Sequence, residues 1–244
     1  MSTRITTELL GELPNLSQVS TSSPLSTSWI RGGDGLIGFG KYAGIVGTYN
    51  AIRAFGIKFE LFKLPKAETL SGKEALIAQL KRIVLPPLKF VITGTGKVGN
   101  GAKEILDAIK IKEVSVENYL TKNYAQPVYT QIDVLEYNKR KDGAVLDFTD
   151  FFKNPQEYVS DFERFTKVSD IYITGHFYDN AAPKILTQEM LNAKDCKIKV
   201  VADISCDVNG PIASTLRSST IAEPLYGYLP SENKEVDVFH PAAI

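Results

Sequence analysis

The stretch that decides the fold is KFVITGTGKVGNGAKEILDAIK, residues 89–110. Its first residues are apolar and β-branched and end at Gly94, which is typical of a buried strand, and helical periodicity begins at Lys97. Between the two lies a GxGxxG pattern made of Gly94, Gly96 and Gly99. A strand, a glycine turn and a helix in this order predict the phosphate-binding corner of a dinucleotide-binding fold.

Each residue of this glycine turn has an expected role. Gly94 permits the tight turn, Gly96 lets the backbone approach a pyrophosphate, and Gly99 lets the helix pack closely on the strand. Lys97 and Val98 open the helix, where free N–H groups attract phosphate. The competing interpretation is a glycine-rich turn that binds no ligand.

The rest of the chain continues the alternation of strands and helices. Strands are expected at residues 170–175 and 197–204, with a short helix at 187–192 before the second of them. A further strand is expected at 113–117, and residues 119–145 are expected to form an insertion outside the central sheet. This order predicts an α/β fold with a doubly wound parallel sheet of the Rossmann type.

An acidic residue is expected about twenty positions after the glycine turn, where it would bind the ribose hydroxyls of the cofactor. Glu113 and Glu117 are the candidates, and Glu117 fits the end of the second strand better. A carboxylate there favours NAD over NADP because it repels a 2′-phosphate. The nearby Lys112 and Lys122 leave NADP open.

The region before the glycine turn divides in two. Residues 1–33 are rich in Ser and Thr and are expected to be a poorly ordered tail or a replaced N-terminal segment. Residues 34–88 are expected to form an interdomain helix and a connection, and residues 89–244 the dinucleotide-binding domain. The helix expected at 39–55 carries small residues at three- and four-residue spacing, which favours a tight helix contact and makes a homo-oligomer conceivable.

Composition excludes several classes of function. The chain has 28 Lys+Arg and 28 Asp+Glu, so no basic field is available for nucleic acid or an anionic membrane. Lys41 and Arg53 interrupt the apolar stretch 36–55, which favours a buried helix over a membrane span. Cys196 and Cys206 form no zinc-ligand pattern, so no metal is expected, and the sparse cysteines favour the cytoplasm.

Two further clusters follow expected strands at the edge where ligands bind in doubly wound sheets. His176 comes directly after DIYITG and suits a proton donor or a hydrogen bond to substrate, although an ordinary loop histidine is equally compatible. Asp207 follows the strand at 197–204 and could orient an amino group of a substrate. Asp203, close by, could instead satisfy local turn amides.

Four segments together resemble the saccharopine dehydrogenase and lysine-oxoglutarate reductase family, within the wider alanine dehydrogenase and transhydrogenase group. They are LIGFGKYAGIVGTYNAIRAFG, VITGTGKVGNGAKEIL, DIYITGHFYDNAAPKILT and KIKVVADISCDVNGPIASTLRSSTIAEPLYGY. The resemblance implies reversible joining of lysine to 2-oxoglutarate, giving saccharopine, with a nicotinamide cofactor. It also implies that Phe39 lies by the substrate and that Ile173, Thr174, Gly175 and His176 line the cofactor and substrate crevice.

The chain departs from this family in two ways. Asp34 and Gly35 stand where members usually carry a basic residue. The family's proton-transferring lysine and histidine lie in an N-terminal domain that residues 1–33 do not resemble, so the flanking domain is expected to be incomplete. Three hypotheses follow: a saccharopine dehydrogenase type of oxidoreductase, truncated in form; a non-catalytic dinucleotide-binding remnant or regulatory module; and an alanine dehydrogenase-like enzyme.

Overall fold

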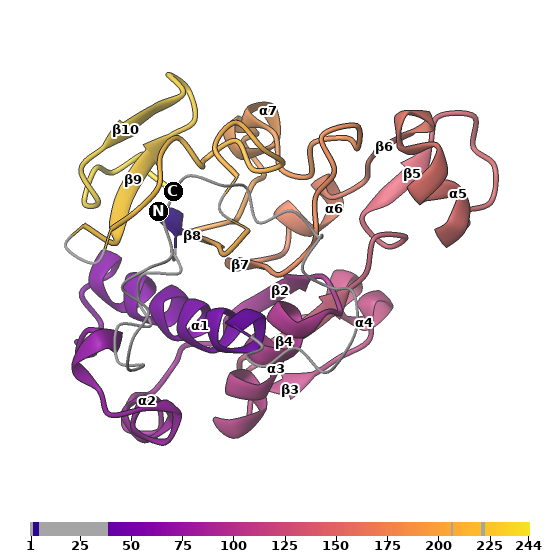
Figure 1. Ribbon diagram of the computed structural model, residues 1–244. Coiled ribbons are helices and arrows are strands. Elements are labelled where there is room, and N and C mark those ends of the chain that lie inside the picture. Colours follow the sequence, from indigo (N-terminus) through magenta and orange to yellow (C-terminus); the bar gives the residue numbers. More distant parts are fainter. Residues whose placement is uncertain (1, 5–38, 206, 221–222) are drawn as a thin grey trace, which may run out of the picture.

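The computed structural model describes residues 2–4, 39–205, 207–220 and 223–244. Within these ranges, eight strands form one sheet in the order β10-β9-β1-β8-β7-β2-β4-β3. From β1 to β3 the neighbouring strands run parallel, and β9 and β10 complete the other edge in antiparallel pairing. The predicted α/β fold with a parallel Rossmann-type sheet is confirmed (Figure 1).

The elements have the following bounds. The strands of the large sheet are β1 Ser2–Arg4, β2 Lys89–Thr93, β3 Lys112–Glu113, β4 Val128–Ile132, β7 Ile171–Thr174, β8 Val200–Asp203, β9 Leu225–Leu229 and β10 Lys234–Val236. The helices are α1 Phe39–Lys58, α2 Lys73–Leu80, α3 Lys97–Ala108, α4 Val116–Thr121, α5 Phe148–Lys153, α6 Glu163–Thr166 and α7 Gln188–Asn192. Two 3-10 helices, η3 Ala67–Thr69 and η4 Pro155–Glu157, and a separate pair of strands, β5 Asn138–Arg140 and β6 Tyr158–Ser160, complete the set.

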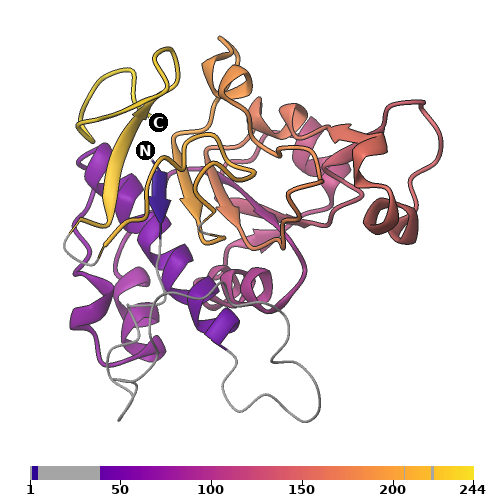
Figure 2. The same cartoon turned by 45° about the horizontal axis from the view of Figure 1, so that its top comes forward.

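Alternate side chains of the central strands enter two separate cores, as expected for a sheet covered on both faces. On β2, Phe90 and Ile92 pack in the core that also holds residues of α1, α2 and α3. Val91 points to the opposite core, where Tyr119 of α4 and Phe165 of α6 are buried. Figure 2 shows α1 and α3 together on one side of the sheet.

The region between α3 and β5 differs from the prediction. Residues 119–145 were expected outside the sheet, but β4 lies inside it and pairs with β2 from Lys89 opposite Val128 to Thr93 opposite Ile132. The strand expected at 113–117 is only the short β3, because Ser115 accepts a hydrogen bond from the Asn118 backbone N–H and starts α4 there. The sheet therefore inserts β4 between the glycine-turn strand and β3.

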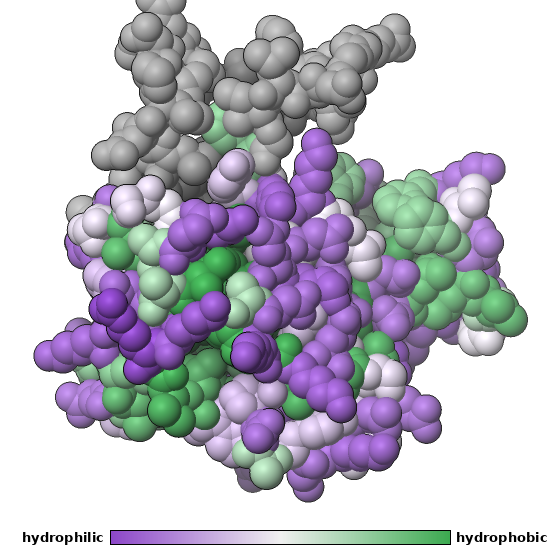
Figure 3. Space-filling model, turned by 90° about the horizontal axis from the view of Figure 1, so that it is seen from below, coloured by the Kyte–Doolittle hydropathy of each residue, from purple (hydrophilic) through white to green (hydrophobic). Residues whose placement is uncertain are grey.

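A small lobe projects from the sheet and carries apolar side chains. It consists of the antiparallel pair β5 and β6 with α5 and η4, and it lies at the right of Figure 1. Val145, Phe148 and Phe152 are exposed on it. In the view from below, hydrophobic side chains gather on this side of the molecule (Figure 3).

The ends of the described chain meet at the other edge of the sheet. Ser2–Arg4, which fall in the segment expected to be a tail, form β1 between β8 and β9. The C-terminal Ile244 exchanges backbone hydrogen bonds with Tyr228 of β9. The remainder of the expected tail lies outside the described residues, as do Asp34 and Gly35, which follow it. No helix among the described residues is both long and apolar enough to cross a membrane.

Candidate functional site

The glycine turn joins β2 to α3 at the carboxyl edge of the sheet, where the sequence predicts it. Gly94 has φ +92°, a conformation that residues with a side chain rarely adopt. A Cβ at Gly99 would lie 1.9 Å from the carbonyl oxygen of Gly94, so this position must stay glycine for the helix to approach the turn. Gly96 differs from both, because a Cβ there would meet no atom of the described residues within 4 Å.

The open space at Gly96 lies at the N-terminus of a twelve-residue helix. The first N–H groups of such a helix have no carbonyl partner within the helix and attract anions. Side chains hold the turn in place: the Gln131 amide donates to the Gly94 carbonyl at 2.9 Å, and the Asn100 amide donates to the Thr95 carbonyl at 3.0 Å. The turn and the open space at Gly96 together form a preformed cradle at the start of α3.

A carboxylate lines the same pocket as this cradle, and it belongs to neither of the two candidates named from the sequence. Glu117 is exposed in the first turn of α4, and Glu113 pairs with Lys103 at the end of the edge strand β3. Asp133 follows β4, the strand next to β2, and lines one pocket with Gly94 and Gly96. The run VYTQI before Asp133 is β-branched and aromatic, so the sequence did contain the signal for this position.

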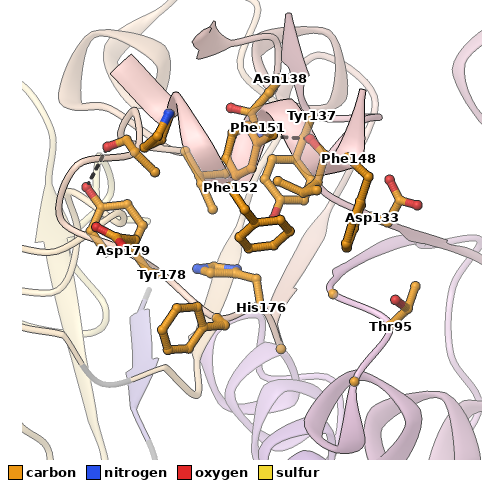
Figure 4. A pocket seen from close by; sticks show the side chains of 18 of the residues that line it. Thr95, Asp133, Tyr137, Asn138, Phe148, Phe151, Phe152, His176, Tyr178 and Asp179 are labelled. Atoms are coloured by element: carbon orange, nitrogen blue, oxygen red, sulfur yellow. Dashed lines mark hydrogen bonds between the residues drawn. The ribbon is translucent and has the colours of Figure 1, made fainter. Parts of the chain in front are cut away.

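The pocket beside the glycine turn has a volume of about 480 Å³, a size typical of small-ligand sites. Its two sides are the segments after β4 and after β7, and the lobe supplies much of its apolar wall (Figure 4). Aromatic side chains dominate that wall: Tyr137, Phe148, Phe151, Phe152, Phe177 and Tyr178. Sequence reasoning assigned no role to the lobe in the site.

Polar contacts fix the lobe against the pocket. Arg140 of β5 pairs with Asp142 and with Asp150 of α5, and the Tyr158 hydroxyl donates to the Asp150 carboxylate at 2.7 Å. Phe151 packs edge-on against Tyr158 with ring centroids 5.0 Å apart. The part of the aromatic wall that the lobe supplies is thus held by α5 and the β5–β6 pair.

His176 lines the pocket and is only 8% exposed. Its Nδ1 lies 2.7 Å from Thr93 Oγ1, which lies 3.0 Å from the Tyr172 hydroxyl. Burial lowers the pKa of His176 to about 4, although the carboxylate of Asp203 acts in the opposite direction. The ring is therefore neutral at physiological pH and poorly suited to the predicted role of proton donor.

The depressed pKa of His176 predicts a pH-dependent contribution to stability. The unfolded chain takes up a proton near pH 6.5 and the folded chain only near pH 4, so the free energy of unfolding falls as pH falls through this window. We expect His176→Phe to remove this part of the dependence, on the order of 3 kcal/mol between pH 7 and pH 4. Urea unfolding of both proteins across this range measures the difference. The prediction would be contradicted if the free energy of unfolding changed with pH by the same amount in both proteins.

Among the other residues predicted to bind substrate or cofactor, some line the pocket and others lie outside its lining. Gly175 lines it, whereas Ile173 is buried in the core and Thr174 is fully buried with its hydroxyl bonded to Asp203. Phe39 begins α1 and lies outside the pocket lining, next to Gly40, whose neighbours are Lys97 and Val98.

Asp207 is exposed beyond β8, also outside the pocket lining, and its charge raises the pKa of the pocket residue Tyr178 after the larger effects of burial and of Asp179. Asp203 is fully buried and serves the local structure. It accepts hydrogen bonds from the Thr174 hydroxyl at 2.8 Å and from the Ser205 backbone N–H at 3.1 Å. This is the turn-amide role that the sequence offered as an alternative.

Comparison with known proteins points to one group of enzymes. The chain is 24% identical over 245 residues to an alpha-aminoadipic semialdehyde synthase of Arabidopsis thaliana, covering 84% of this chain and 23% of that protein. It is 24% identical over 238 residues to the mitochondrial alpha-aminoadipic semialdehyde synthase of Bos taurus, covering 79% of this chain and 25% of that protein. This chain is a distant relative of those enzymes.

A third relative widens the group. The chain is 24% identical over 182 residues to the NAD(+), L-lysine-forming saccharopine dehydrogenase of Neurospora crassa, covering 71% of this chain and 40% of that protein. The chain therefore spans about a quarter of the length of the synthases and well under half of the dehydrogenase. No family model matches it. The resemblance drawn from the four sequence segments is confirmed at low identity over the core region.

Proposed function

We propose that this chain binds NAD and takes part in hydride transfer to or from the amine or imine carbon of an amino-acid substrate, in the manner of a saccharopine dehydrogenase. The observation that carries the proposal is the open cradle at Gly96, which lies at the start of α3 and shares one pocket with a carboxylate, Asp133. The relatedness to a saccharopine dehydrogenase supports the reaction class.

The residues present fit a dinucleotide. The turn from Gly94 to Val98 would hold the pyrophosphate through backbone N–H groups, and Asp133 would accept hydrogen bonds from the ribose hydroxyls. When bound, NAD supplies the acceptor for the hydride. The protein's own contribution in this pocket is to orient the cofactor and, through the aromatic wall, to exclude water.

Cofactor titration combined with turnover tests this proposal. The purified chain is titrated calorimetrically with NADH and NADPH, and saccharopine oxidation is followed in the same preparation by the absorbance of NADH. We expect NADH to bind and saccharopine to be oxidised. Absence of dinucleotide binding would refute the assignment of the cradle.

The same measurement distinguishes the proposed function from two alternatives. His176 is neutral and buried, which favours a module that binds dinucleotide without catalysing turnover. Binding without oxidation of any substrate supports that function and excludes the enzyme. Oxidation of alanine in preference to saccharopine instead supports an alanine dehydrogenase-like enzyme, because the shared fold does not fix the substrate pocket.

The position of Asp133 predicts the choice between NAD and NADP. We expect Asp133→Asn to lower the affinity for NAD by about tenfold and to improve NADP relative to NAD, because the change removes the charge that repels a 2′-phosphate. Asparagine can still accept the Leu135 backbone N–H that now bonds Asp133 Oδ1 at 2.8 Å. The matched control is Glu117→Gln on α4, which we expect to change neither affinity. If only Glu117→Gln changed the affinity for NAD, Glu117 would be the ribose-binding carboxylate, as the sequence predicts.

A further inference from the structure

His176 leaves one polar atom of the pocket without a partner. Its Nε2 is buried and makes no hydrogen bond to any described residue, whereas Nδ1 is bonded to Thr93. A buried nitrogen in this state is unfavourable and calls for a hydrogen-bond partner. Figure 4 shows His176 facing the aromatic side chains of the lobe, and its ring centroid lies 6.3 Å from that of Tyr137.

The hydrogen bonds behind His176 determine which ring nitrogen carries the proton. Within the described chain, Thr93 Oγ1 is the partner of both the Tyr172 hydroxyl, at 3.0 Å, and His176 Nδ1, at 2.7 Å. Only one arrangement uses both hydroxyl protons in hydrogen bonds: the Tyr172 hydroxyl donates to Thr93 Oγ1, and the Thr93 hydroxyl donates to His176 Nδ1. Nδ1 is then an acceptor, and a neutral ring must carry its proton on Nε2.

The pocket also indicates which part of a ligand meets this N–H group. If Asp133 binds a ribose, as proposed above, the base joined to that ribose must lie in the same pocket, which His176 lines as well. The wall around it is largely aromatic and suits a flat ring. Adenine offers ring nitrogens that accept hydrogen bonds.

We infer that Tyr172, Thr93 and His176 form a one-way hydrogen-bond relay whose end, the Nε2–H of His176, donates to a ring nitrogen of the adenine base. The inference rests on the proposed dinucleotide function and assigns His176 to recognition of the base. His176 is thereby a binding residue, and Thr93 and Tyr172 are positioning residues that act through it.

Nitrogen NMR of histidine-labelled protein tests the relay directly. The chain has two histidines, and His240→Phe assigns the signals of His176. We expect Nδ1 of His176 to give the signal of an unprotonated nitrogen and Nε2 that of a protonated one. A proton on Nδ1 overturns the inference. Thr93→Val is expected to mix the two forms, and Thr93→Ser to restore the single form by returning the hydroxyl.

Binding of the two halves of the cofactor tests the ligand. We expect AMP to bind the native chain and to bind His176→Phe about tenfold more weakly, while nicotinamide mononucleotide binds both alike. The exposed His240→Phe is the control and should leave both affinities unchanged. Equal AMP binding by the native chain and His176→Phe overturns the inference while the dinucleotide function stands. The inference is likewise overturned, with the dinucleotide function intact, if nicotinamide mononucleotide shifts the NMR signals of His176 and AMP does not. A native chain that binds no NAD overturns both the inference and the proposed dinucleotide function.

Discussion

Replacing Gly96 by alanine should abolish most of the cofactor affinity and leave the fold intact. The added methyl group meets no atom within 4 Å in the part of the chain that the structure describes, and the backbone at Gly96, with φ −80°, is accessible to alanine. The methyl group would instead occupy the space that a pyrophosphate needs to reach the N–H groups of α3. Loss of one or two such charge-assisted hydrogen bonds costs about 3 kcal/mol, roughly a 100-fold rise in Kd.

Calorimetric titration with NADH and a thermal melt of the same samples check this expectation. Gly99→Ala provides the contrast, because its Cβ would lie 1.9 Å from the Gly94 carbonyl oxygen, so stability and binding should be lost together. Unchanged NADH affinity in Gly96→Ala would show that the phosphates do not approach this turn. A large drop in melting temperature would show instead that the open space has a structural role.

The features that the sequence predicted correctly are encoded locally. The strand at Lys89–Thr93, the glycine turn and the helix that begins at Lys97 lie within one continuous stretch, and their residue types suit their backbone conformations. The strand before His176 is equally self-contained. In such segments the hydrophobic pattern and the tertiary structure favour the same conformation.

The sequence could not indicate which carboxylate shares the pocket with the glycine turn, because strand order is not a local property. Counting about twenty residues from the glycine turn assumes that the next strand pairs with the first, which would put Glu117 beside the turn. Here the next strand is a two-residue edge strand, and the neighbour of β2 on that side of the sheet is β4, which ends at Ile132 just before Asp133. A sequence alone does not say which of two short β-rich runs takes the central position.

The environment of His176 also could not be read from the sequence. Its partner Thr93 is 83 positions away, and its aromatic surroundings come from a lobe whose strands pair Asn138 with Ser160. Its position after a strand predicted that His176 faces the ligand edge, and in the structure it lines the pocket. Whether the ring is charged depends on burial, which is set by these distant segments.

Replacing Gly44 by alanine should strongly destabilise the fold, because α1 and α3 meet backbone to backbone at this point. A Cβ there would lie 2.0 Å from the Val98 carbonyl oxygen and 2.8 Å from the Ala102 nitrogen, and no side-chain rearrangement relieves a clash with backbone. Alanine gains about 1 kcal/mol in helix propensity. Forcing the helices apart opposes this gain and should lower the free energy of unfolding by about 3 kcal/mol net.

The decisive comparison is with Gly40→Ala, one turn earlier on the same helix. Its Cβ would meet side-chain atoms of Lys97 and Val98 at 3.3 and 3.4 Å, and both side chains can shift slightly, so this variant should match the native chain in stability. Gly101→Ala, on the opposite helix with its Cβ 2.1 Å from the Lys41 carbonyl oxygen, should behave like Gly44→Ala. Urea unfolding of the three variants measures these differences. Equal stability of Gly44→Ala and Gly40→Ala would contradict the close contact of α1 with α3 at Gly44. Because α3 carries the glycine turn at its N-terminus, displacement of the helix in Gly44→Ala should also weaken NADH binding.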